Sequence, residues 1–256
     1  DILRALRKQG VTILLITHKL KEIMAITDDV SVMRGGEMVA HLQTADTSPA
    51  ELAELMGGRK VLLEVDHTPA RPGAPVVDVQ DLCLTDAAGI DQLKQISITL
   101  REGEIVGIAG VSGNGQSELL DVLSGIMAPT GGHFTVGTNQ ITAERPSDPA
   151  ELRDFGVAHV PEDRHKCGIV LPFSAAESMI LGYSGGDEED GGWWLSPSKL
   201  EESCAGRMRE FDIRPPIPKL QSANFSGGNQ QKIVLAREIS TQPKLLLVGQ
   251  PTRGVD

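Results

Sequence analysis

Apolar residues gather in three uninterrupted runs along the chain. They read VTILLIT at residues 11–17, EIVGIAG at 104–110 and KLLLVGQ at 244–250. Runs that are apolar at successive positions and rich in β-branched side chains are typical of strands buried on both faces of a parallel sheet. Because segments with helical spacing lie between these runs, the pattern predicts an α/β fold with a largely parallel sheet.

Start and stop signals mark the helices between the runs. Three capping boxes, each a short polar cap followed three residues later by a glutamate, pair Ser48 with Glu51, Asp148 with Glu151 and Ser174 with Glu177. Gly57 is expected to end the first of these helices. Helical spacing alone predicts further helices at residues 1–9 with a stop at Gly10, and at 19–28, 118–125 and 198–211.

Shorter signals predict the remaining strands and loops. Residues 28–42 read as a hairpin that turns at Gly35 and Gly36, and strands are expected at 76–84, 95–100 and 156–160. The segment from Gly182 to Trp194 is too polar and too rich in glycine for regular structure, which predicts a surface loop.

A linker at residues 61–75 divides the chain. Its sequence from Glu64 to Pro75, EVDHTPARPGAP, contains three prolines and shows no apolar periodicity. We therefore expect one unit up to about residue 60 and a second at residues 76–256.

Composition excludes several classes of function. The 35 acidic and 24 basic residues give a net charge of −11, which argues against a nucleic-acid surface. No apolar run reaches the roughly 18 residues needed to span a bilayer, and residues 1–10 lack the apolar core of a signal peptide, so a membrane role would need a partner. The 3 cysteines are widely spaced, which favours neither a disulfide framework nor a metal site and points to the cytoplasm.

Two glycine-rich stretches could bind phosphate. GVSGNGQS, from Gly110 to Ser117, matches the spacing of a phosphate-binding loop between a strand and a helix, except that Gln116 stands where that motif has lysine. The second stretch is NFSGGNQQK at residues 224–232, where Ser226 can cap a helix whose N-terminus attracts an anion. A plain glycine turn and an ordinary helix cap are the alternatives for the two stretches.

The order of these motifs resembles the nucleotide-binding domain of ATP-binding cassette (ABC) transporters, a P-loop NTPase fold with an antiparallel β subdomain and a helical subdomain. Residues 110–117 stand where that family has the Walker A motif, 226–230 its signature motif, 244–250 its Walker B strand and 254–256 its D-loop. His18, within ITHKLKEI, resembles the switch histidine that contacts the γ-phosphate.

The resemblance also implies a tandem arrangement. Residues 1–60 look like the C-terminal tail of a first nucleotide-binding domain, and residues 76–256 like a second domain truncated after its D-loop. The segments VPEDR at 160–164, SGGNQQK at 226–232 and QPTRG at 250–254 are similar to those in the second halves of fused tandem ATPases that serve simple-sugar and nucleoside importers.

The family's nucleotide contacts carry over residue by residue. ATP and Mg²⁺ are the implied cofactors, with Ser117 as a metal ligand. The implied nucleotide-binding residues are Gly110, Ser112, Gly113, Asn114, Gly115, Gln116, Ser117, Glu118, Glu162, Ser226, Gly227, Gly228 and Gln230.

Departures from the family pattern suggest that one site is degenerate. Gln116 in place of lysine is the first of these departures. In addition, Gly249 replaces the Walker B aspartate, which weakens the metal site, and Gln250 replaces the glutamate that serves as general base. Glu162 stands where the Q-loop glutamine is expected, and CLTDAAG at 83–89 lacks the aromatic residue that stacks on adenine. Loss of a general base alone costs about 10²- to 10⁴-fold in rate. Because each ATP in this family lies between the Walker motifs of one domain and the signature of the other, the resemblance implies one active site and one degenerate site.

The implied role is an ATP-hydrolysing subunit of an importer, peripheral to the cytoplasmic face of the membrane. Its implied partners are integral-membrane permease subunits, a solute-binding protein indirectly and the paired nucleotide-binding domain, with no nucleic acid. A non-transport tandem ABC ATPase and a nucleotide-binding pseudoenzyme module are the alternatives. QPTRG together with GNGQS favours a nucleoside over a ribose-type sugar as solute.

Overall fold

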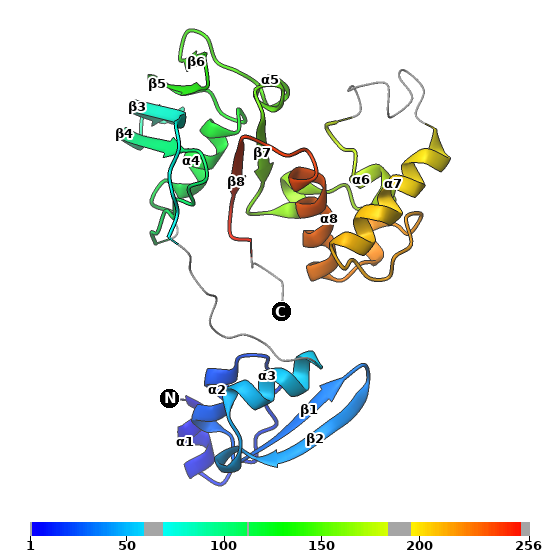
Figure 1. Cartoon of the computed structure of the whole chain (residues 1–256). Coiled ribbons are helices and arrows are strands. Elements are labelled where there is room, and N and C mark those ends of the chain that lie inside the picture. Colours follow the sequence, from blue (N-terminus) through cyan, green and yellow to red (C-terminus); the bar gives the residue numbers. More distant parts are fainter. Residues whose placement is uncertain (1, 59–68, 112, 184–195, 252–256) are drawn as a thin grey trace. The chain divides into compact units, whose positions relative to one another are not determined.

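A computed structural model describes residues 2–58, 69–111, 113–183 and 196–251. The chain divides into two compact units, Asp1–Pro69 and Ala70–Asp256, and each is considered by itself (Figure 1). The division falls within the predicted linker, of which residues 61–68 lie outside the described part. No helix among the described residues is long and apolar enough to cross a membrane.

The first unit is a β-hairpin covered by helices. Its elements are α1 (Ile2–Lys8), α2 (Leu20–Ile26), β1 (Asp29–Arg34), β2 (Glu37–Gln43) and α3 (Pro49–Gly57). The antiparallel hairpin turns at Gly35 and Gly36, which confirms the prediction. Figure 1 shows α2 and α3 beside this hairpin, and their contact buries a small core of Ile23, Val30, Val32 and Leu52.

Helix α3 begins where the sequence predicts, and it ends one residue later than predicted. The Ser48 hydroxyl accepts a hydrogen bond from the backbone N–H of Glu51, as a cap should. The Glu51 carboxylate accepts a hydrogen bond from the Thr47 hydroxyl at 2.8 Å. Gly58, with φ of 69°, adopts the left-handed conformation and caps the helix, so the prediction of a stop at Gly57 was wrong by one residue.

The apolar run at 11–17 forms no strand, which corrects the expectation. Leu14 is 90% exposed and Ile16 is 91% exposed. A strand becomes buried on both faces only between neighbouring strands and covering helices, and no described strand pairs with this run. The composition of the run is typical of a strand inside a sheet, but the described strands of this unit do not pair with it.

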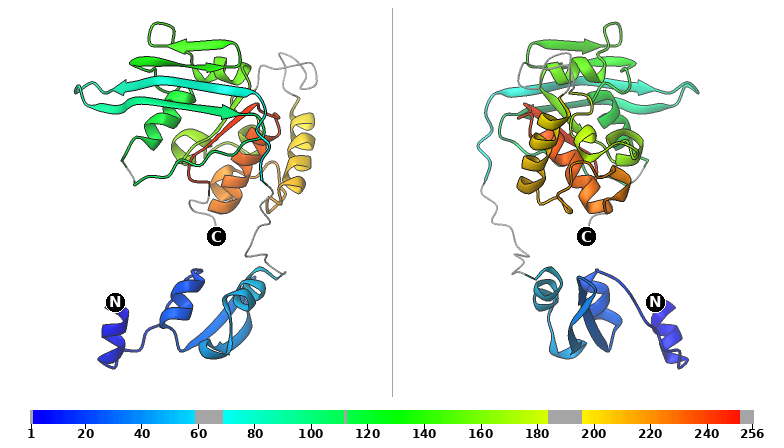
Figure 2. Two further views of the ribbon diagram at one scale, coloured as in Figure 1. Left: turned by 60° about the vertical axis from the view of Figure 1, so that its left-hand side comes forward. Right: turned by 90° about the vertical axis from the view of Figure 1, so that its right-hand side faces the viewer.

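The second unit begins with an antiparallel sheet in the order β4-β3-β5-β6 (Figure 2). The predicted strands at 76–84 and 95–100 form β3 (Pro75–Thr85) and β4 (Asp91–Arg101), both longer than expected. The hairpin of β5 (Gly131–Val136) and β6 (Asn139–Thr142) was not predicted. Alternating apolar residues of these strands form a core with α4 (Gln116–Leu123). The largest buried side chain of this core is Phe134, in β5.

A second, parallel sheet in this unit consists of β7 (Val157–Val160) and β8 (Leu245–Val248). Helix α5 (Pro149–Asp154), capped by Asp148, precedes β7. The expected strand at 104–110 is absent, and Ile105 is 97% exposed. Without that strand and the run at 11–17, the described sheets are mostly antiparallel, so the expectation of a largely parallel sheet was wrong for this part of the chain.

The helical part of the second unit carries α6 (Ala175–Ser178), α7 (Pro197–Glu210) and α8 (Gly227–Ile239). In Figure 2, α7 and α8 lie on the opposite side of the unit from the antiparallel sheet. The complete capping box of Ser174 and Glu177 starts α6, as predicted. Most of the loop predicted at 182–194 lies outside the described residues, as does the D-loop at 254–256.

A comparison of Gly132, which lies in β5, with Gly137, which lies in the turn after β5, shows how closely the strands of the antiparallel sheet approach one another. Gly132 (φ of 68°) and Gly137 (φ of 59°) both adopt a conformation that costs other residues about 1–2 kcal/mol. A Cβ at Gly132 would also collide with the backbone of Asp81, whereas a Cβ at Gly137 would meet open space. We expect Gly132→Ala to lose about 1–3 kcal/mol more stability than Gly137→Ala in urea unfolding of the chain. Equal losses would contradict the close approach.

Candidate functional site

The phosphate loop leads from the exposed segment 104–110 into α4. Gly113 and Gly115 have positive φ, and Gly115 is the N-cap residue of α4. The side-chain amides of Asn114 and Gln116 both donate hydrogen bonds to the carbonyl of Val111, at 3.1 and 3.3 Å. Side chains thus hold the loop closed on itself. Ser112 lies outside the described residues.

Gln116 folds back over the start of the loop. A Cβ at Gly110 would overlap with the Gln116 amide, so this glycine permits the close approach. A neutral amide therefore lies against the loop where the phosphate-loop motif has a lysine. The arrangement retains backbone groups for phosphate but contributes no positive side-chain charge.

Three residues predicted for the site meet beside this loop. The Ser117 hydroxyl, on the first turn of α4, donates a hydrogen bond to Glu162 Oε2 at 2.8 Å. Glu162 follows β7, and Gly249 follows β8. A Cβ at Gly249 would lie 2.5 Å from Cγ of Glu162, so the backbone of one strand end lies directly against the side chain of the other. Gln250, the next residue, has a φ of 42° and is exposed.

Asp121, which sequence reasoning missed, adds negative charge near this contact. Its burial raises the pKa of the carboxyl, the positive charge of Lys166 lowers the pKa, and the charges of Glu118 and Glu162 raise it. The one sequence feature that could have placed Asp121 near the site is its position one turn along α4 from Ser117.

The signature stretch forms the helix N-terminus that the sequence predicts. Ser226 is the N-cap residue of α8, and its exposed hydroxyl accepts hydrogen bonds from Asn229, from the backbone N–H at 3.4 Å and from the side chain at 2.9 Å. Gly227 and Gly228 are the first two residues of the helix and contribute no side chain to its first turn, and both are half-buried. Such an end, with the partial positive charge of the helix dipole, suits a phosphate group.

The Gln230 side chain is buried and bound within the protein. Its Oε1 lies 2.8 Å from His165 Nε2 and accepts a hydrogen bond from Arg164 Nε at 3.3 Å, while its Nε2 donates to the carbonyl of Ser222 at 3.0 Å. His165 and Arg164 belong to the turn that follows Glu162. A nucleotide contact by Gln230 stays a prediction, and in this structure the amide joins the signature helix to the Glu162 loop.

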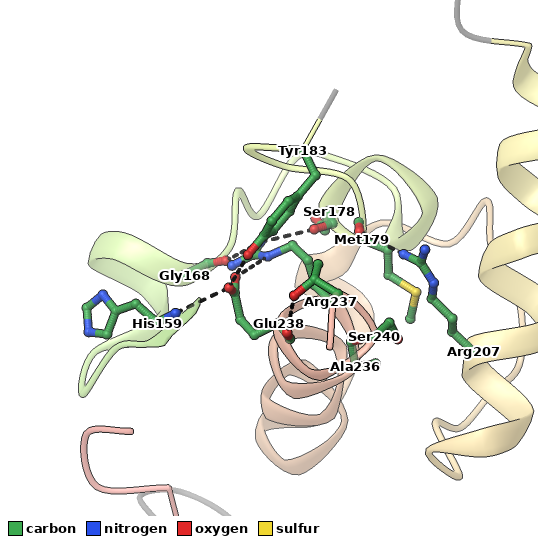
Figure 3. A network of polar contacts seen from close by, with 11 residues as sticks. His159, Gly168, Ser178, Met179, Tyr183, Arg207, Ala236, Arg237, Glu238 and Ser240 are labelled. Atoms are coloured by element: carbon green, nitrogen blue, oxygen red, sulfur yellow. Dashed lines mark hydrogen bonds and ion pairs between the residues drawn. The ribbon is translucent and has the colours of Figure 1, made fainter. Parts of the chain in front are cut away.

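A buried ion pair fixes the other half of α8 (Figure 3). Arg237 Nε contacts Glu238 Oε1 at 2.7 Å, and both side chains are almost fully buried. The Arg237 guanidinium also donates to the carbonyl oxygens of Gly168 and Ser178, at 2.8 and 3.1 Å. Because a buried charge is tolerated only when it is paired and hydrogen-bonded, these contacts fix how α8 lies against its neighbours.

The Glu238 carboxylate extends this network to two further segments (Figure 3). The Tyr183 hydroxyl donates to Glu238 Oε2 at 2.6 Å, and the backbone N–H of His159, in β7, donates to the same oxygen at 3.3 Å. Burial and the Glu238 carboxylate raise the pKa of Tyr183. Burial lowers the pKa of His159, which favours the neutral form of its ring in the folded chain.

His18 belongs to the first unit and is exposed between the run at 11–17 and α2. The Thr17 hydroxyl beside it accepts a hydrogen bond from the backbone N–H of Lys19 at 3.2 Å and donates to Glu22. Its role as a switch histidine stays a prediction.

A family model for ABC transporters matches residues 93–253, which hold both glycine-rich stretches and the Glu162 loop. The chain belongs to the ABC transporter family. Over its whole length it is 41% identical to the glucose import ATP-binding protein TsgD13 of Haloferax volcanii and 38% identical to the nucleoside import ATP-binding protein NupA of Lactococcus lactis. It covers 46% of the former and 50% of the latter, so the chain spans about half the length of these relatives.

Solved ABC cassettes share the fold. One in its ADP conformation superposes with a TM-score of 0.56 at 20% identity, covering 72% of this chain and 71% of that cassette. A dimeric bacterial cassette gives a TM-score of 0.57 at 22% identity, covering 70% of this chain and 76% of that cassette. The chain therefore has the P-loop NTPase fold of ABC cassettes, as the sequence predicts.

The network around Glu238 predicts how the single tyrosine titrates. Because the pKa of Tyr183 is raised in the folded chain, folding favours its protonated form. The resulting stability is fully present below the unfolded-state pKa of about 10 and is lost as pH rises above it. We expect tyrosinate absorbance at high pH to appear only as the chain unfolds, and Glu238→Gln to lower the titration midpoint. Tyr183→Phe, which removes the signal, is the control. Ionisation near pH 10 in the folded chain would contradict the network.

Proposed function

We propose that this chain is part of the ATP-hydrolysing subunit of an ABC importer that takes up a nucleoside or simple sugar. The family match, together with relatives named as glucose, nucleoside and guanosine import ATP-binding proteins, supports this role. Residues 1–60 would complete a first nucleotide-binding domain, and residues 76–256 would form most of the second. The activity is that of the full tandem protein, and we expect this part alone to be inactive.

The contrast between the two glycine-rich stretches is the observation that carries the proposal. The N-terminus of α8 has an exposed cap hydroxyl and two glycines at the start of its first turn, features that suit a phosphate. The phosphate loop of the same unit has a neutral Gln116, Gly249 without a side chain, and Gln250 in place of a general base. The unit therefore suits the role of completing another domain's site better than hydrolysis at its own.

In the closed tandem protein, the Walker motifs of the first domain would hold ATP against Ser226, Gly227 and Gly228. The backbone N–H groups of α8 would bind and orient the γ-phosphate, and His18 would contact it from the first domain's own tail. Mg²⁺ supplies charge neutralisation of the phosphates in such sites. Closure of the two domains would exclude water other than the attacking molecule and drive the permease.

The degenerate site would bind nucleotide but turn it over little. Without a general base the rate falls about 10²- to 10⁴-fold. Gln116 cannot neutralise phosphate charge, which lowers the rate further. The subunit would lie on the cytoplasmic face of the membrane, bound to permease subunits that, with a solute-binding protein, select the solute.

The proposal predicts a ranking of variants in the complete tandem protein. We expect Ser226→Ala or His18→Ala to lower ATPase activity by about 10²-fold, because each removes a contact to the transferred phosphate. Gln250→Ala should barely change the rate. Ser174→Ala, which also removes a helix cap, is the matched control for Ser226 and should retain activity.

The opposite ranking, with Gln250 dominant, would contradict the assignment of the active site. Activity that is unaffected by the permease would favour a non-transport ATPase. Nucleotide binding without any hydrolysis by the full protein would favour a pseudoenzyme module.

A further inference from the structure

Two serine helix caps of the second unit use their hydroxyl groups in opposite ways. At α6, the Ser174 hydroxyl accepts a hydrogen bond from the backbone N–H of Glu177 and donates its own hydrogen to Glu177 Oε2 at 2.7 Å. At α8, the Ser226 hydroxyl accepts hydrogen bonds from the backbone N–H of Asn229 and from its side-chain Nδ2. The third residue of each helix therefore decides whether the cap gives up its hydrogen within the protein.

A second contact fixes the direction of the hydrogen bond between Asn229 and Ser226. A side-chain amide carries an acceptor oxygen at one corner and an NH₂ donor at the other. Asn229 Oδ1 accepts a hydrogen bond from the backbone N–H of Arg214 at 2.8 Å. Because a backbone N–H cannot accept, the reversed amide would place two donors against each other. The NH₂ group of Asn229 must therefore face Ser226, where it donates at 2.9 Å.

Helix α8 itself holds the Arg214 segment in place. Lys232 Nζ, on the second turn of the helix, donates to the carbonyl of Asp212 at 2.7 Å and contacts its carboxylate at 3.4 Å. Arg214 Nε donates to the same carboxylate at 2.8 Å. Exposed ion pairs of this kind contribute little to stability. Their effect is local, since they place the N–H of Arg214 opposite the amide of Asn229.

These contacts leave one hydrogen-bonding capacity of the Ser226 hydroxyl for a ligand. A serine hydroxyl has one hydrogen to donate and two lone pairs that accept. Asn229 directs two donors at the oxygen, and no acceptor among the described residues takes the hydrogen. The hydroxyl is exposed, so this hydrogen faces an incoming group. A phosphate oxygen, which only accepts, fits such a hydroxyl, whereas a donor group on a ligand does not.

We propose that Asn229 is a positioning residue that keeps the Ser226 hydroxyl a donor to the γ-phosphate of the nucleotide held by the other domain. Asn229 acts through Ser226 and does not itself need to touch the phosphate. A carboxylate at position 229 would take up the hydroxyl hydrogen, as Glu177 does at α6. This inference rests on the proposed function, which brings the nucleotide to this end of α8.

Asn229→Asp tests the inference because it exchanges a donor for an acceptor of the same shape. In the full tandem protein with its permease, we expect the ATPase rate to fall by about 10- to 100-fold, toward the rate of Ser226→Ala, because a hydrogen bond to a charged group is lost. The thermal unfolding midpoint should stay the same or rise, since an acidic side chain in the first turn of a helix is favourable. A merely structural role for Asn229 would lower both quantities.

The Ser226→Ala background separates this effect from repulsion between the new carboxylate and the nucleotide. Once the hydroxyl is absent, adding Asn229→Asp has no hydrogen to redirect, so the rate should change by less than about 3-fold. Repulsion would act equally in both backgrounds. A further loss as large as that caused by Asn229→Asp in the wild-type protein would therefore overturn the inference.

Failure of the inference and failure of the proposed function give different results. Wild-type activity in Asn229→Asp, together with a large loss in Ser226→Ala, overturns the positioning role alone and leaves the assignment of the active site intact. Wild-type activity in Ser226→Ala overturns the proposed role of this helix end, and the inference with it.

Discussion

The buried pair of Arg237 and Glu238 is the interaction on which the second unit's geometry depends. Two charges inside a core require a complete set of partners. Carbonyls of Gly168 and Ser178 and the Tyr183 hydroxyl supply them from separate segments. These contacts therefore fix the position and rotation of helix α8 against the segments that carry its partners. Ser226 at its start is fixed as a consequence, and Gln230 extends the same constraint to the loop that carries Glu162.

That constraint is compatible with the two unequal sites that we propose. The N-terminus of α8 has an exposed cap hydroxyl, while the phosphate loop is closed by the amides of Asn114 and Gln116. The contact between Ser117 and Glu162 keeps an oxygen pair beside that loop although Gly249 has no side chain.

Local signals were predicted well from the sequence because their physics is local. Helix caps at Ser48, Ser174 and Ser226 depend on residues within one turn, and all three caps are found. The apolar run at 104–110 was misjudged because a buried strand needs partners that no local pattern specifies. The contact between Ser117 and Glu162 joins residues 45 positions apart, so only the paths of α4 and β7 reveal it.

The central claim, one active and one degenerate site in the tandem protein, is tested most directly by the nucleotides that remain bound after one turnover. The full-length protein would be mixed with Mg²⁺ and labelled ATP, separated rapidly from free nucleotide and quenched, and its bound ATP and ADP counted. The account predicts one retained ATP for each ADP formed. Conversion of both bound nucleotides to ADP at similar rates would contradict it.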